Sequence, residues 1–183
     1  MKDTKASKLK KIIKNYGYIP ATIAICYLLF GVVLAYGIVP TQSMEPTIRA
    51  GSFYIGTRLA YQVKDVERGD IVVFAHDGMF LVKRAIGLPG EKVRIDNGLV
   101  FINDIRIDED AYLPEGTPTV SELGLSPIEY IVPEDSYFVM GDNRMNSADS
   151  RFWEDSHFVP RDTIVSNIWG SVPIPFWDAL ANS

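Results

Sequence analysis

A serine and a lysine are the side chains of this 183-residue chain best suited to covalent chemistry, because histidine is scarce. Ser43 lies on a short proline-bracketed segment, residues 40–46. A serine hydroxyl is a poor nucleophile unless a base removes its proton, so Ser43 alone predicts little. Lys83 lies in the apolar stretch 80–86, where strand alternation would place it and Arg84 on opposite faces. Either one of these cations points inward, or both are solvated at the edge of a sheet.

A polar segment at residues 141–151 is a third place where chemistry could reside. It sets short hydrogen-bonding side chains between alternating charges, among them Asp142, Ser147, Asp149 and Arg151. A plain polar turn held by side-chain-to-backbone bonds has the same composition. A calcium loop fits poorly, since the sixth position counted from Asp142 is Ser147, where glycine is needed.

Other active-site chemistries are poorly represented in the sequence. Both histidines, His76 and His157, lie in polar, turn-like surroundings that favour solvated rings over a Ser-His-Asp triad. The nucleophile elbow, the zinc-protease helix motif, the Walker loop and the dinucleotide fingerprint do not occur. The single cysteine, Cys26, excludes an internal disulfide framework and a zinc site built on several thiolates. We therefore expect no metal site.

The elements that must position these residues begin with an uncharged run at 15–44, whose apolar part, 18–39, is long enough to be a membrane helix. At about 1.5 Å per residue it spans roughly 33 Å, against a hydrocarbon core of about 30 Å. Six lysines and one aspartate give residues 1–14 a charge of +5, which by the positive-inside rule places that end in the cytoplasm. A cleaved signal peptide, which has a shorter apolar region, and a buried core helix are the alternatives.

These features predict three parts: a cytoplasmic basic segment at 1–14, a single transmembrane anchor at 15–40 and an extracytoplasmic body at 41–183. The protein is therefore expected in the cell membrane as a single-pass protein, with the lipid bilayer as one partner. The net charge of −5 leaves −10 for residues 15–183, which argues against a nucleic-acid partner.

The body is expected to be mostly β, an antiparallel sheet behind the single N-terminal transmembrane helix. Strand-like runs recur, separated by turn signals, and Asn97-Gly98 is the strongest hairpin signal. The expected strands are 53–59, 71–74, 79–86, 92–96, 99–102, 105–107, 130–132, 137–140 and 163–168. Residues 108–135 hold eight acids, four prolines and no lysine or arginine, which predicts a loop-rich insertion and not a catalytic segment.

Large apolar residues near the C-terminus have two interpretations. They form either a membrane-facing patch or a last strand followed by a tail. The residues concerned are Ile168, Trp169, Phe176 and Trp177.

Four segments, in this order behind this anchor, resemble the motif boxes of bacterial type I signal peptidases. The nucleophile, structural-strand and general-base boxes are similar to Ser43-Met-Glu-Pro-Thr, Arg68-Gly-Asp-Ile-Val-Val-Phe and Lys83-Arg-Ala-Ile-Gly-Leu-Pro-Gly-Glu. The last box is similar to Gly141-Asp-Asn-Arg with Asn146-Ser147 and Asp149-Ser-Arg151. The likeness covers about residues 10–170, and the single anchor and short insertion look most like the small Gram-positive form.

The resemblance implies a Ser/Lys-dyad serine endopeptidase in which Ser43 is the nucleophile and Lys83 the general base. It implies an oxyanion hole made by the Ser43 backbone N–H and the Thr41 hydroxyl, and a Ser147 hydroxyl that orients the lysine amine. It also implies two supporting ion pairs, Asp149 with Arg151 and Asp142 with Arg84. The implied substrates are exported preproteins, cleaved at their signal peptides, and contact with the protein translocation machinery fits that role.

Elementary physical chemistry is consistent with a lysine base. A lysine acts as a base only when neutral, and at its ordinary pKa of about 10.4 neutralisation near pH 7 is disfavoured by roughly 4–5 kcal/mol. Burial against apolar side chains lowers a lysine pKa, which favours an inward-facing Lys83 beside Leu81 and Ala85. This chemistry requires neither a metal nor an organic cofactor.

Two other functions remain open from the sequence. A membrane-anchored serine protease of other specificity would use the same residues on a different substrate. A non-enzymatic surface β-domain would bind a partner and would keep its function without Ser43 or Lys83.

Overall fold

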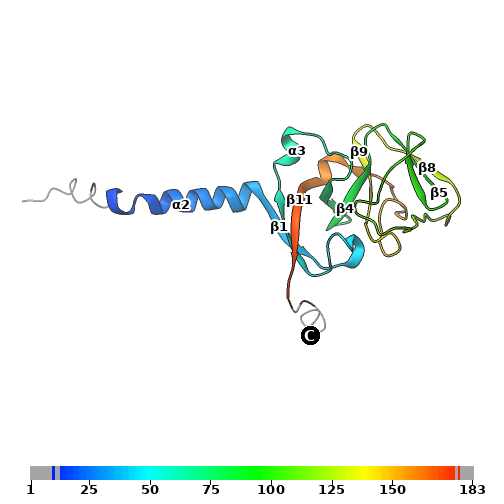
Figure 1. Cartoon of the computed structure of the whole chain (residues 1–183). Coiled ribbons are helices and arrows are strands. Elements are labelled where there is room, and N and C mark those ends of the chain that lie inside the picture. The colour runs from blue at the N-terminus through cyan, green and yellow to red at the C-terminus, as the bar shows by residue number, and fades with distance from the viewer. Residues whose placement is uncertain (1–9, 11–12, 176, 178–183) are drawn as a thin grey trace, which may run out of the picture. The chain divides into compact units, whose positions relative to one another are not determined.

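The computed structural model describes residue 10, residues 13–175 and residue 177, and the structural statements below concern those residues. The chain divides into two units, an N-terminal unit that ends at Leu34 and a body that begins at Ala35. Figure 1 shows the helix of the first unit in blue and the strands of the body in colours from light blue to red.

The N-terminal unit is an apolar helix, Ile13–Val33, which is 21 residues long. It includes α2 (Tyr18–Tyr27) and continues through the wider π-helical turns of η1 (Leu28–Val33). At about 1.5 Å per residue it extends roughly 31 Å, enough to cross the hydrocarbon core of a bilayer. Most of the predicted basic segment, including Lys2, Lys5, Lys8 and Lys11, lies outside the described residues.

The helix ends earlier than the sequence predicts. Residues 34–39, expected to be the last turns of the anchor, instead form strand β1 (Leu34–Val39), which lies beside β2 (Ser52–Thr57). Apolar composition alone does not distinguish a membrane helix from a strand. Gly37 lets the strand pass close to Tyr54, because a Cβ there would lie 2.8 Å from the tyrosine ring. Pairing with the sheet therefore replaces the expected continuation of the helix.

The larger of two sheets in the body has seven strands in the order β1-β2-β11-β3-β4-β9-β10. Its other strands are β3 (Ile71–His76), β4 (Met79–Gly87), β9 (Ser136–Met140), β10 (Val159–Pro160) and β11 (Ile164–Pro173). The pairings from β2 to β10 are antiparallel. In Figure 1, β4 and β9 lie next to one another at the centre of the body.

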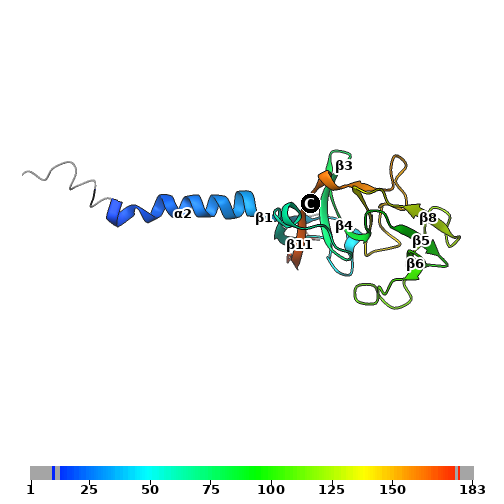
Figure 2. The same ribbon diagram turned by 90° about the horizontal axis from the view of Figure 1, so that it is seen from above.

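The smaller sheet has four antiparallel strands in the order β7-β6-β5-β8. They are β5 (Lys92–Asp96), β6 (Leu99–Ile102), β7 (Ile105–Arg106) and β8 (Ile128–Ile131). Figure 2 shows β5, β6 and β8 grouped apart from β3 and β4. Asn97 and Gly98 join β5 to β6 with φ values of 50° and 81°, the positive pair that a type I′ hairpin turn requires.

The predicted fold class is confirmed: the body is mostly antiparallel β behind one apolar N-terminal helix. Strands β1 and β10 were not expected. Within the acidic stretch 108–135, β8 occupies residues 128–131, and an isolated bridge joins Ser121 to Gly124. The remaining short elements of the body are η2 (Gln42–Met44), α3 (Ala60–Val63) and η3 (Arg161–Thr163).

The second half of β4, residues 83–87, is buried, because a core cluster packs on each face of the strand there. Its Ala85 packs in one core cluster with residues of β3 and β9, and its Ile86 packs in a second cluster that includes β5 and β6. Lys83 pairs with Val72 of β3, and Arg84 pairs with Met140 of β9. Both cations are therefore interior, and neither lies at a solvated sheet edge.

The C-terminal apolar residues do not all lie on one exposed surface. Ile168 and Trp169 belong to β11, as the last-strand interpretation predicts. Ile168 packs against the cluster of Val39, Met44 and Ile48, whereas Trp169 is exposed. Trp177 packs so closely over Gly51 that a Cβ there would collide with its ring. Phe176 lies outside the described residues.

Candidate active site

Ser43 and Lys83 form a buried hydrogen bond although they lie 40 residues apart in the sequence. Lys83 Nζ donates to Ser43 Oγ at 2.7 Å, and the two residues are 4% and 8% exposed. Lys83 projects from β4 and Ser43 from η2, the short turn after β1. The Thr41 hydroxyl lies 3.3 Å from Ser43 Oγ. The structure thus brings the predicted nucleophile, base and oxyanion-hole threonine together.

The surroundings of Lys83 favour a neutral amine. Burial lowers its pKa from the ordinary 10.5 to about 8, and the positive charge of Arg151 acts in the same direction. The carboxylates of Asp149 and Asp142 raise it, but by less than burial lowers it. With a pKa of about 8, roughly one amine in ten is unprotonated at pH 7. That fraction is sufficient for a base that acts only in the neutral form.

The 141–151 loop is hydrogen-bonded directly to the nucleophile turn. The Asn143 backbone N–H donates to the Ser43 carbonyl oxygen at 3.0 Å, and its side-chain amide donates to the Gln42 carbonyl oxygen at 3.1 Å. Gly141 is the point of closest approach, because a Cβ there would collide with both Ser43 O and Ser147 Oγ. The sequence analysis assigned no role to Asn143 or Gln42, since amide side chains in a polar loop carry no signal of their own.

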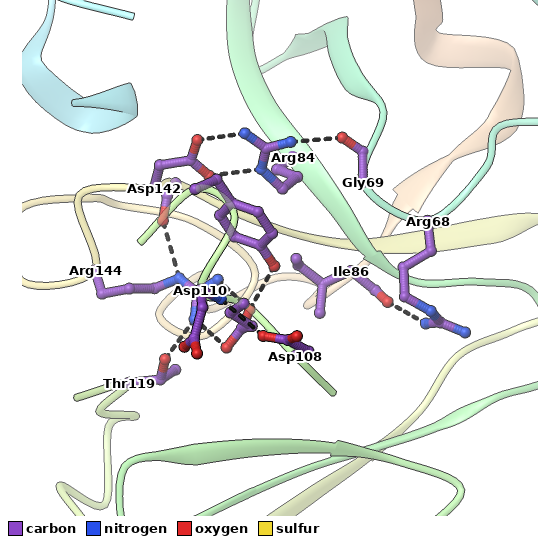
Figure 3. Close-up of polar contacts among 12 residues, drawn as sticks. Arg68, Gly69, Arg84, Ile86, Asp108, Asp110, Thr119, Asp142 and Arg144 are labelled. Atoms are coloured by element: carbon purple, nitrogen blue, oxygen red, sulfur yellow. Dashed lines mark hydrogen bonds and ion pairs between the residues drawn. The ribbon is translucent and has the colours of Figure 1, made fainter. Parts of the chain in front are cut away.

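Arg84 holds the start of this loop through an ion pair with Asp142. Its Nε and Nη2 donate to the two carboxylate oxygens of Asp142 at 2.8 Å and 2.6 Å, a bidentate arrangement. Arg84 Nη1 also donates to the Gly69 carbonyl oxygen at 2.7 Å, and Figure 3 shows the guanidinium between these two partners. The predicted pair is present, and it joins β4 to the loop that follows β9.

The second predicted ion pair, Asp149 with Arg151, is completely buried. Arg151 donates to the two Asp149 oxygens at 2.8 Å each, and both residues are 0% exposed. Asp149 Oδ2 also accepts the Gly141 N–H at 2.9 Å. Arg151 donates further to the carbonyl oxygens of Val120 and Arg144. The pair therefore ties the two ends of the 141–151 loop together.

Removing this carboxylate charge is expected to destabilise the fold strongly. In Asp149→Asn, the Arg151 guanidinium stays buried without its counter-ion, which should lower the free energy of unfolding by about 3–5 kcal/mol. Urea unfolding of the detergent-solubilised chain measures the change. Glu129→Gln is the control: Glu129 is half exposed beside Lys92 and Arg94, so its loss should cost under about 1 kcal/mol. Equal stability losses in the two variants would contradict the structural role of the buried pair.

Ser147 does not make the hydrogen bond that the resemblance implies. Its hydroxyl is buried and has no hydrogen-bond partner among the described residues, and Lys83 Nζ instead donates to Ser43. Ser147 nevertheless lies beside Gly141, next to the nucleophile turn. It is a buried hydroxyl with unused donor and acceptor capacity at the edge of the site.

The histidines are engaged elsewhere. His157 Nδ1 donates to the Ser150 carbonyl oxygen at 2.6 Å. The His76 ring stacks on Trp153 with 4.1 Å between ring centroids. Neither is hydrogen-bonded to Ser43 in the described part of the chain. Over the same residues, no group of three or more His, Cys, Asp or Glu side chains is placed to hold a metal ion.

Comparison of the sequence with known protein families shows which family the chain belongs to. The family described as signal peptidase, peptidase S26, matches residues 11–177 of the chain. The chain belongs to this family. The resemblance drawn from the four motif boxes is therefore confirmed, and this signal peptidase is a serine endopeptidase, a hydrolase.

Individual relatives are similar over most of this signal peptidase. A probable signal peptidase I-2 of Synechocystis is 37% identical over 169 residues, covering 82% of this chain and 70% of its own length. Signal peptidase I S of Bacillus subtilis is 34% identical over 158 residues, covering 82% of this chain and 84% of its own length. A crystal structure of a signal peptidase I from Enterococcus faecalis has 31% sequence identity and a TM-score of 0.45, covering 57% of this chain and 97% of its own.

Proposed function

We propose that this signal peptidase is a membrane-bound enzyme that removes N-terminal signal peptides from exported preproteins, with Ser43 as nucleophile and Lys83 as general base. The observation that carries the proposal is the buried 2.7 Å hydrogen bond between the two side chains. Family membership supports the substrate class, since the relatives are named signal peptidases.

The reaction proceeds through an acyl-enzyme. Neutral Lys83 takes the proton of Ser43, and Oγ adds to the scissile carbonyl carbon. The tetrahedral intermediate collapses as the lysine ammonium returns a proton to the leaving amine and the C–N bond breaks. Lys83, neutral again, then takes a proton from water, the hydroxide attacks the ester, and Ser43 leaves with that proton.

The oxyanion of each tetrahedral intermediate is stabilised by the Ser43 backbone N–H and the Thr41 hydroxyl. The Ser43 N–H belongs to the first turn of η2, where helical N–H groups lack intrahelical acceptors. Thr41 is adjacent, with its hydroxyl 3.3 Å from Ser43 Oγ. One such donor contributes about 3–4 kcal/mol of transition-state stabilisation in other serine proteases.

The remaining predicted site residues support the dyad. The pairs of Arg84 with Asp142 and of Arg151 with Asp149 hold the 141–151 loop in place. They also neutralise charges near Lys83, so that burial dominates its pKa. When the lysine side chain turns from Ser43 toward the leaving group, its amine forms a hydrogen bond with the Ser147 hydroxyl, which has no other partner among the described residues. Ser147 thereby orients the amine.

The N-terminal helix acts as the membrane anchor. We assign residues 1–14 to the cytoplasm, the apolar span to the bilayer and the body to the extracytoplasmic side, following the lysine cluster. The helix ends at Val33, and residues 34–42 separate it from Ser43. Covalent attachment to the anchor keeps the body at the membrane, where the signal peptide of an exported preprotein is also located. Contact with the translocation machinery is consistent with this location.

A cleavage assay in lipid vesicles tests the proposed substrate. The full chain is incubated with a labelled preprotein and, in parallel, with the same protein lacking its signal peptide. Cleavage of the preprotein at one junction, with the second substrate left intact, is the expected result. Cleavage of both at many positions would indicate a protease of other specificity. Cleavage of neither would favour a non-enzymatic surface domain.

A further inference from the structure

Arg144 in the 141–151 loop is a buried cation whose charge is neutralised from outside the loop. It is 1% exposed, and its guanidinium donates to the Glu109 carboxylate at 2.6 Å and 3.0 Å. The same guanidinium donates to the Thr119 hydroxyl and, through Nε, to the Gly141 carbonyl oxygen at 3.1 Å. Figure 3 shows Arg144 directed toward Thr119. Glu109 and Thr119 belong to the acidic stretch that the sequence predicts to be non-catalytic.

The same stretch is linked to the loop a second time, indirectly, through Tyr112 and Arg84 of β4. The Tyr112 hydroxyl donates to Glu109 Oε1 at 2.7 Å, and its ring lies 4.0 Å from the Arg84 guanidinium in a cation–π contact. Arg84 in turn holds Asp142. Glu109 and Tyr112 therefore engage both arginines that flank Asp142, and burial together with Glu109 raises the pKa of Tyr112 so that it stays a donor.

The residues next to Arg144 in the loop contact the turn that carries the nucleophile. Arg144 follows Asn143, whose backbone N–H donates to the Ser43 carbonyl oxygen at 3.0 Å. Gly141, which accepts from Arg144, packs against Ser43 and Ser147 without room for a Cβ. A displacement of Arg144 therefore moves residues that touch the nucleophile turn.

We propose that Glu109 is a positioning residue of the active site: through Arg144 it fixes the 141–151 loop against the turn that carries Ser43. The inference rests on the proposed function, because it assigns Glu109 to hydrolysis by the Ser43–Lys83 pair. Loss of the Glu109 charge leaves Arg144 buried without a counter-ion, which favours an opened loop. Opening admits water to Lys83 and displaces the charges that face it, Asp149, Arg151 and Asp142.

Glu109→Gln in the full chain, reconstituted in vesicles, tests the role of the charge. With a labelled preprotein, kcat should fall roughly 10- to 100-fold, as expected for a small misplacement of catalytic groups, while KM changes less than about threefold. The rise of kcat/KM with pH should move to higher pH, because a solvated lysine regains its ordinary pKa. Glu109→Asp, which keeps the carboxylate, should lose less activity.

Tyr112→Phe tests the same contact with a milder change, because it removes only the hydrogen bond to Glu109 and should still fold. Its loss of kcat and its shift of the pH profile should be in the same direction as those of Glu109→Gln, but smaller.

Asp96→Asn is the matched control, since it neutralises a carboxylate that pairs with Arg94 at 2.6 Å in the smaller sheet. Its kcat and pH profile should equal those of the wild type. Hydrogen exchange gives a readout independent of activity: amides of residues 141–151 should exchange faster in Glu109→Gln and at the wild-type rate in Asp96→Asn.

Two results would overturn the inference. One is a folded Glu109→Gln protein with the wild-type kcat, pH profile and loop protection. The other is a loss of kcat with an unchanged pH profile and unchanged protection of 141–151, which would mean that the carboxylate only stabilises the fold. If the wild type cleaves no preprotein, the proposed function fails, and the exchange experiment still decides whether Glu109 holds the loop.

Discussion

Ser43→Ala is expected to lower kcat/KM for preprotein cleavage by at least about 10⁴-fold, the scale seen when a nucleophile is removed from other serine proteases. Without Oγ no acyl-enzyme forms, and Lys83 loses its hydrogen-bond partner. Residual cleavage can come only from oxyanion stabilisation and substrate binding. The measurement is single-turnover cleavage of a labelled preprotein by the full chain in vesicles.

Ser52→Ala is the matched control for this change. Ser52 is a buried serine at the start of β2 whose hydroxyl has no hydrogen-bond partner among the described residues. Its removal should leave kcat/KM within about twofold of the wild type, because a buried serine outside the site takes no part in the chemistry. A Ser43→Ala protein that still cleaves at a comparable rate would exclude Ser43 as the nucleophile.

Lys83→Met is expected to be nearly as inactive as Ser43→Ala, within about tenfold, because the nucleophile and its base act as a unit. Methionine fills the volume of the lysine stem but cannot accept the Ser43 proton. For the same reason the double variant should be no less active than either single variant. Lys92→Met is the control, since Lys92 is a surface lysine paired with Asp104 at 2.9 Å. Substantial processing by a folded Lys83→Met protein would contradict the assignment of the base.

The stability of Lys83→Met shows whether the variant is inactive because it fails to fold. Below pH 8 the wild type buries a protonated Lys83, which at a folded pKa of about 8 against 10.5 unfolded costs about 3 kcal/mol. The methionine variant lacks this cost, so at pH 6 it should unfold at higher urea concentration than the wild type. Its advantage should shrink as pH rises from about 8 to about 10.5, where the unfolded lysine also becomes neutral.

The strands and hairpins of the body could be predicted because their signals are local. Asn97-Gly98 adopts the positive φ values that its turn type requires, and β3, β5 and β6 begin at the predicted residues. The end of the helix could not be predicted in this way. Residues 34–39 are apolar in either structure, and their pairing with β2, the next strand of the chain, makes them a strand.

In the candidate site, too, the residues that belong to sequence motifs could be predicted, whereas contacts between distant segments could not. Ser43, Lys83 and the two ion pairs follow from sequence motifs, and the structure places each pair in contact. The partners of Arg144 could not be predicted, because an acidic, proline-rich stretch is typical of a solvated loop. Glu109 lies 35 residues before Arg144, and only the folded chain brings the two together.

The central claim is that a buried, hydrogen-bonded Lys83 is neutral at a pH where other lysines are charged, and NMR titration of this side chain tests it most directly. In the full chain labelled with [¹³Cε]lysine, the Lys83 signal is identified by its loss in Lys83→Met. We predict a titration midpoint near pH 8, with kcat/KM rising over the same range. A midpoint near the ordinary lysine pKa of 10.5, with a rate that instead follows a group near pH 6.5 and is lost in His157→Ala, would contradict the account.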